Sequence, residues 1–229
     1  MLVGLARLAL LFIVPAISTN TISASSNQEL LDAVQAGHLG TVETLLRLDG
    51  SSVDVNAVID DVWALYLAAR AGRLEIVEIL LVNGADTNVA THSGHTALGA
   101  AAFGGHLSVA AKLLTAGAYI NSITEQGETP LHAVARAGHN EKGDLSETCA
   151  VFKVGDPETC VTSVLSALVA AGAFVNANGK GGQTPLHLAC TAGHSKTVSA
   201  LLEAGAFVDL QDISGFTPLH IVTGYGFVE

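Results

Sequence analysis

Histidine is the residue of this 229-residue chain whose side chain could most readily bind a metal ion or transfer a proton, and nine are present. Seven of them recur in two contexts, after Thr-Pro-Leu or after the Gly that opens an expected second helix: His132, His187 and His220, then His38, His106, His139 and His194. Only His92 and His95 lie outside both contexts, and two histidines without a third ligand are weak evidence for zinc. We therefore expect neither a metal site nor a cofactor.

Motifs that assemble a catalytic centre are absent from the sequence. It holds no Gly-x-Ser-x-Gly, no Gly-x-x-x-x-Gly-Lys and no His-Glu-x-x-His. The adjacent carboxylates Asp60 and Asp61 fall in an expected hairpin tip, where a solvated turn accounts for them. We predict that the chain is not an enzyme.

Cysteines could form a disulfide in an oxidising compartment. Cys149 and Cys160 lie close together in sequence, so a bond between them would close a short loop and stabilise it by roughly 2–3 kcal/mol. The alternative is a pair of unrelated surface thiols. Cys190 falls within an expected helix, where we interpret it as a small buried hydrophobic residue.

A repeat organises the remaining sequence. Leu65, Leu98 and Leu131 are spaced by 33 residues, and Leu186 and Leu219 follow after 55 and 33. A period of this length is typical of stacked supersecondary units, and the longer step indicates one insertion.

Each unit is predicted to be a turn, a helix, a turn and a second helix. In one unit Thr96 can cap the first helix, Gly105 ends it, and Gly117 ends the second helix in the left-handed conformation. Prolines occupy the first helical position in three sister units, namely Pro130, Pro185 and Pro218.

The pattern Gly-x-Thr-Pro-Leu-His-x-Ala-x-x-x-Gly-His, followed by a leucine pair and Gly-Ala-x-x-Asn, resembles the ankyrin repeat and is clearest at residues 182–209. The resemblance implies an all-α repeat solenoid of stacked helix-turn-helix units joined by β-hairpin-like loops. It also implies that the recurring histidines are framework residues, whose rings bond to neighbouring turns. For function it implies a protein-binding scaffold rather than a reaction.

The expected domain spans residues 27–229 and contains about five and a half units. They run over residues 27–56, 60–88, 93–121, 126–176 and 181–209, with a truncated sixth from Ser214. The sixth unit stops before a second helix, which favours a fragment of a longer protein over an improvised cap.

Three departures from the pattern stand out. Units two and three replace Thr-Pro-Leu-His with Trp63-Ala64-Leu65-Tyr66 and Thr96-Ala97-Leu98-Gly99. The first turns of their first helices should therefore be less well held. Gly138 and Gly172 are 34 residues apart where sister units have 12, which places an insertion at about residues 140–161, between the two helices of unit four. The insertion is either neutral decoration or a recognition element.

The first residues are predicted to be a signal peptide, residues 1–18, followed by a linker, residues 19–26. Arg7 precedes a short apolar run, and Ala16-Ile17-Ser18 offers small residues to a signal peptidase. The alternatives are a hydrophobic helix packed on the first repeat units and an uncleaved membrane anchor. We expect a secreted or periplasmic protein, with no stable membrane span after cleavage.

The net charge indicates which class of partner is unsuitable, and the repeat geometry indicates where a partner would bind. A formal net charge of −11 argues against nucleic acid as partner, because a phosphate backbone requires a basic stripe and the ten Lys and Arg form no run. Stacked units align corresponding residues, so one position of each first helix forms a predicted binding column of Gln35, Arg70, Phe103, Arg136 and Thr191. The hairpin tips add Thr91, His92, Glu125, Gln126, Lys180 and Ile213.

We therefore expect a protein-interaction scaffold or adaptor outside the cytoplasm. The alternative is the amino-terminal targeting portion of a larger secreted toxin or effector, with its active domain beyond Glu229.

Overall fold

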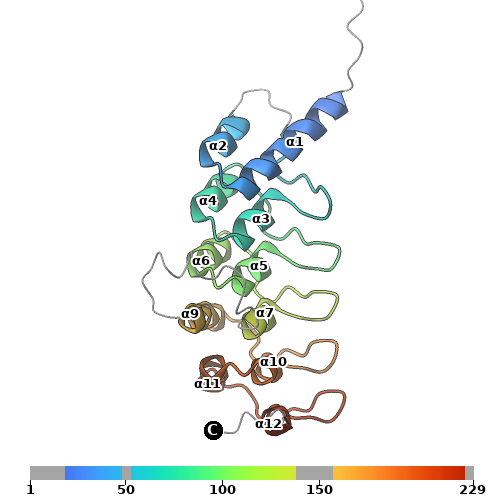
Figure 1. Cartoon of the computed structure of the whole chain (residues 1–229), viewed down its shortest axis with the longest axis vertical. Helices are drawn as coiled ribbons and strands as arrows, with labels where there is room; N and C mark the ends of the chain where they lie inside the picture. Colours follow the sequence, from blue (N-terminus) through green and yellow to red (C-terminus); the bar gives the residue numbers. More distant parts are fainter. Residues whose placement is uncertain (1–18, 48–52, 138–156, 225–229) are drawn as a thin grey trace, which may run out of the picture.

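The helices of the chain stack in two columns, with hairpins along one side (Figure 1). The computed structural model describes residues 19–47, 53–137 and 157–224, of which 19–24 and 157–163 are described by their backbone. The first helices of the units are α1 (Thr19–Ala36), α3 (Ala64–Arg70), α5 (Ala97–Phe103), α7 (Pro130–Ala137), α10 (Pro185–Ala192) and α12 (Pro218–Gly224). The second helices are α2 (Leu39–Arg47), α4 (Leu74–Val82), α6 (Leu107–Thr115), α9 (Pro157–Ala170) and α11 (Ser195–Glu203). The predicted all-α solenoid is confirmed.

Helix starts differ between units as the sequence predicts. In unit five Thr184 Oγ1 accepts the His187 N–H, and the His187 ring accepts the Thr184 N–H in return. Thr96 caps only the Gly99 N–H, and Trp63 provides no side-chain cap. The unit with Thr-Pro-Leu-His therefore has the more firmly tied first turn, because its cap is reciprocal.

The core is a thin layer of leucine and small residues between the two columns. Leu65, Leu98, Leu131 and Leu186 are at most 2% exposed, and alanines let successive helices approach closely. Leu219 occupies the same position in α12 but is 67% exposed, because no further helix covers it within the described residues. Burial of each unit thus depends on its neighbour. Among the described helices, none is both long and apolar enough to cross a membrane.

The loops between units are the predicted β-hairpin-like turns. In unit three the Thr91 N–H donates to the His95 carbonyl at 3.0 Å, and the next hairpins repeat this closure. Gly94 has a φ of +82°, and a Cβ there would lie 2.7 Å from the Cα of Thr124 in the following hairpin. Neighbouring hairpins are also joined directly, because the Glu125 N–H donates to the Ser93 carbonyl at 2.9 Å.

Asp60 and Asp61 lie in a hairpin tip, as predicted. Both have positive φ, 51° and 65°, and the turn is closed by two bonds between Ile59 and Val62. The His92 N–H donates to the Asp61 carboxylate at 2.7 Å, and this bond is the main reason that the pKa of Asp61 lies below its usual value. The acidic pair therefore has a structural explanation.

Residues 19–26 correct one expectation. They are the first turns of α1 rather than a linker. No glycine or proline interrupts residues 19–36, so a helix nucleated where Leu30 and Val34 are buried extends toward its amino end.

The insertion lies between the two helices of unit four, as the glycine spacing predicts. Helix α7 ends at Ala137 and α9 begins at Pro157, so residues 157–161 belong to α9. Most of the insertion lies outside the described residues.

The predicted disulfide between Cys149 and Cys160 also lies outside the residues whose side chains are described. Cys190 is buried and free, as expected.

A ladder of asparagines joins the far side of the units. Asn121 shows the pattern: its Nδ2 donates to the Gly172 carbonyl at 3.3 Å, and its Oδ1 accepts the Phe174 N–H at 2.9 Å. Asn56, Asn88 and Asn176 make the same two bonds to the units that follow them. Each asparagine thus satisfies two backbone groups at the end of the neighbouring second helix.

We predict that Asn121→Ala lowers the free energy of unfolding by about 1–2 kcal/mol, because it removes both bonds between units three and four. Urea denaturation followed by circular dichroism measures the loss. Asn178→Ala, at an exposed hairpin residue, is the control and should be close to neutral. Equal stability of Asn121→Ala and wild type would contradict the role of the ladder.

Candidate functional site

A cleft of about 300 Å³ lies in the angle between the hairpins and the first helices of units two to four. Its lining includes three residues of the predicted column, Arg70, Phe103 and Arg136. The other two column residues, Gln35 and Thr191, lie outside the cleft. The structure therefore gathers the middle of the predicted column and leaves out its ends.

Helix geometry explains why these three residues come together. Arg70 and Phe103 are the last residues of α3 and α5, and Arg136 is the second-last residue of α7. Adjacent first helices pack directly on one another, so equivalent helix ends lie side by side. Small residues between them, Gly99 and Ala133, leave the cleft open. Phe103 is 37% exposed although it is a large apolar residue.

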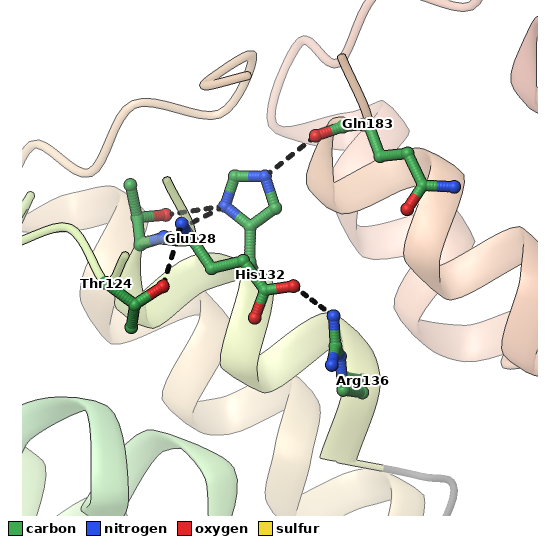
Figure 2. Close-up of polar contacts among 6 residues, drawn as sticks. Thr124, Glu128, His132, Arg136 and Gln183 are labelled. Carbon is green, nitrogen blue, oxygen red and sulfur yellow. Dashed lines mark hydrogen bonds and ion pairs between the residues drawn. The ribbon is translucent and has the colours of Figure 1, made fainter. Parts of the chain in front are cut away.

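The charges of the cleft are two guanidinium groups and one carboxylate. Arg136 Nη2 forms an ion pair with the Glu128 carboxylate, as Figure 2 shows. The Glu128 backbone is held in turn, because its N–H donates to Thr124 Oγ1 at 3.2 Å. Arg70 is exposed, and no carboxylate among the described residues pairs with its guanidinium. One of the two cations thus remains available to a ligand.

His132 is the buried support beneath this site (Figure 2). Its Nδ1 accepts the Thr129 N–H at 3.1 Å, so the ring is neutral there and Nε2 carries the proton. Nε2 donates to the Gln183 carbonyl at 3.0 Å and so joins unit four to unit five. Burial lowers the pKa of His132, with an opposing contribution from this carbonyl. The ring is a structural bridge rather than a proton donor to a substrate.

His106 makes the equivalent contact from the other recurring context. Its Nε2 lies 3.0 Å from the Arg70 carbonyl, so the start of α6 is tied to the end of α3 at the cleft. Burial lowers the pKa of this ring as well. These bonds confirm the framework interpretation for His132, His187 and His106.

None of the predicted hairpin-tip residues lines the cleft, and one other described histidine does. His92 pairs with Asp61 at 2.6 Å on the surface, whereas His95 lines the cleft. In the described part of the chain, no three His, Cys, Asp or Glu side chains gather closely enough to hold a metal ion. The hairpin residues Gln126 and Lys180 line a second cavity of about 290 Å³, which shares Glu128 and Arg136 with the cleft.

Tyr66 and Glu128 are among the cleft residues that sequence reasoning missed, and they add a ring and a carboxylate to the lining. Tyr66 occupies the position that histidine holds in the Thr-Pro-Leu-His units, and it packs on Trp63 with ring centroids 5.1 Å apart. Its departure from the repeat was the available signal. Glu128 gave no signal, because its pairing with Arg136 depends on how the hairpin folds back over α7.

Comparison with known proteins identifies the repeats. A sequence profile described as "Ankyrin repeats (3 copies)" matches residues 30–124 and 149–229, which together are well over half of the chain. The stretch between them contains α7 and the first part of the insertion. No curated protein matches the chain significantly.

We predict that the fold loses stability as the pH falls from about 7.5 to about 5.5. His106 and His132 have lowered pKa values in the folded chain. The unfolded chain therefore takes up protons first, as the pH passes about 6.5, and stability declines until the lower folded pKa is reached. Urea midpoints across this range measure the decline.

His132→Gln should reduce the pH dependence, because it removes one of the two rings. Its stability at about pH 7.5 should also fall, since the bridge to Gln183 is altered. His95→Gln, at an exposed residue, is the control. A His132→Gln protein that keeps the full pH dependence of wild type would contradict the assignment.

Proposed function

We propose that the chain, which belongs to the ankyrin repeat family, is a protein-interaction scaffold that holds its partner in the cleft of units two to four. The observation that carries the proposal is Phe103, a partly exposed aromatic residue between two arginines. Aromatic and arginine side chains are enriched where binding energy concentrates. The scaffold performs no chemistry of its own in this proposal, and nucleic acid is not its partner, because the chain is strongly acidic.

The chemistry of the cleft favours one kind of segment. Phe103 and the small residues Gly99, Ala100 and Ala133 offer an apolar surface to one side chain of the partner. Among the described residues, no carboxylate pairs with the Arg70 guanidinium, so Arg70 favours an acidic residue next to that side chain. A protein with a formal charge of −11 otherwise repels acidic segments, so the unpaired guanidinium of Arg70 decides where such a segment binds.

We further propose that the protein acts outside the cytoplasm. The support is the apolar run after Arg7 and the small residues Ala16 and Ser18. Burial raises the pKa of the Cys190 thiol to about 11, so this cysteine is poorly reactive while Cys149 and Cys160 pair.

We predict that random peptides selected on the wild-type protein are enriched in an apolar residue next to Asp or Glu. Phe103→Ala should weaken such a peptide at least about five-fold, and Arg70→Gln should weaken it in a salt-dependent way. Val82→Ala, at a residue 86% exposed on α4, is the control. Selected peptides that bind Phe103→Ala and wild type equally would place recognition elsewhere, for example on the insertion at residues 140–161.

We predict that the exported protein begins at Thr19. Intact-mass analysis of protein recovered from the exported compartment measures this, and retention of residues 1–18 would refute it. We also predict that Cys149 and Cys160 form a disulfide in the exported protein while Cys190 stays free. Alkylation after unfolding without reductant should label Cys190 alone, whereas three labelled cysteines would reject the Cys149–Cys160 bond.

A further inference from the structure

The second cavity, of about 290 Å³, adjoins the cleft on the side of unit five. Glu128 and Arg136 line both cavities, so the two meet at this ion pair. Beyond the pair, the lining includes Gln126 of the unit-four hairpin and Lys180 and Gln183 of the unit-five hairpin. We call this second cavity the lysine pocket. A chain segment that lies in the cleft can therefore continue into the pocket along the same row of hairpins.

Lys180 is a cation that the fold leaves without a partner. The same tip position holds His92 in unit three, where the Asp61 carboxylate of the preceding hairpin lies 2.6 Å from the ring. In the hairpin before Lys180, the position of Asp61 is taken by Gly127, which has no side chain. In the described part of the chain, no carboxylate pairs with the Lys180 ammonium group.

The backbone under Lys180 is nevertheless held firmly. Its N–H donates to the Gln126 carbonyl at 2.6 Å, and the Gly179 N–H closes the hairpin on the Gln183 carbonyl at 2.9 Å. Gly127 permits this close approach, because it has a φ of +70° and a Cβ there would lie 3.1 Å from the Lys180 nitrogen. The Lys180 side chain itself is exposed. Folding thus fixes the base of this side chain without using its charge.

Two side-chain amides of the pocket are also unused. Gln126 and Gln183 accept hydrogen bonds through their backbone carbonyls, whereas their side-chain amides make none with the described residues. Figure 2 shows the Gln183 amide directed away from His132. The carboxylate in the lining, on Glu128, is paired with Arg136. The pocket therefore offers one unpaired cation and two amide donors.

We infer that the lysine pocket binds a second carboxylate of the partner segment whose first carboxylate lies at Arg70. This inference rests on the proposed function, because it extends the segment held in the cleft. A carboxylate only accepts hydrogen bonds, so it suits the Lys180 ammonium and the amide N–H groups of Gln126 and Gln183. The single charge of a carboxylate also equals the single unpaired charge of the pocket.

The acidity of the whole chain does not prevent this binding. At physiological ionic strength, charges farther apart than about 8 Å are largely screened in solvent. The groups that touch a segment in the two cavities therefore decide its electrostatic energy. Arg70, Arg136 and Lys180 outnumber Glu128, the carboxylate in the described linings. The groove is locally positive in a chain of net charge −11.

The stacking of the units sets the spacing between the parts of the segment. Adjacent packed helices lie roughly 8–10 Å apart, so unit five is about 16–20 Å from Phe103 in unit three. An extended chain spans roughly 3.3–3.6 Å per residue, so the second carboxylate should lie at least about five residues from the apolar residue at Phe103. The partner motif is therefore an apolar residue beside one acidic residue, with a second acidic residue farther along.

Peptides selected from a random library on the wild-type full chain test the inference. We expect the selected sequences to contain this motif, and fluorescence anisotropy measures their dissociation constants. Lys180→Gln should weaken them about three- to ten-fold, as should replacing the distal Asp or Glu of the peptide by Asn or Gln. The two changes together should cost no more than either alone, because they remove the same contact.

Lys196→Gln is the matched control, because it removes the same charge at an exposed residue of α11 in the same unit. It should leave peptide binding unchanged, and Lys180→Gln should keep the thermal midpoint of wild type. Selected peptides without a distal acidic residue, or equal binding by Lys180→Gln and wild type, would overturn the inference. The proposed function would still stand if Phe103→Ala weakened those peptides. Peptides that bind Phe103→Ala as tightly as wild type would contradict both.

Discussion

The rest of the structure depends on the contacts between neighbouring units, which asparagine and histidine side chains hold by hydrogen bonds. No unit can bury its two short helices alone, so each needs the next unit to complete its core. Asn121 and its counterparts fix that contact on the far side by satisfying a carbonyl and an N–H of the following unit. His132 and His187 fix it near the hairpins by reaching a carbonyl of the next unit.

These fixed contacts turn a sequence period into a surface. A residue at the end of one first helix lies next to its counterparts in the adjacent units, which is why Arg70, Phe103 and Arg136 line one cleft. The same asparagine bonds place Tyr119, Phe174 and Phe207 at equivalent positions of successive units. Surface positions in this chain are therefore determined by the framework, while their chemistry is free to vary.

The irregular units concentrate near the cleft. Unit two replaces the framework histidine with Tyr66 and so brings an aromatic ring to the lining. Its first helix has no side-chain cap, because Trp63 is buried where other units have threonine. Unit four carries the insertion immediately after α7, whose Arg136 pairs with Glu128. Local departures from the repeat thus mark the part of the array where recognition is proposed.

The sequence alone determined the repeat, the helix pairs, the hairpin position of Asp60 and Asp61, and the place of the insertion. Those features depend on local rules, such as capping threonines, first-turn prolines and left-handed glycines at a fixed period. Tertiary structure decided which column residues share a cleft and which do not. It also decided that Glu128 neutralises Arg136 while Arg70 keeps its charge available, and that residues 19–26 extend α1. These outcomes depend on how hairpins and helices of different units approach in space, and a linear period carries no information on those distances.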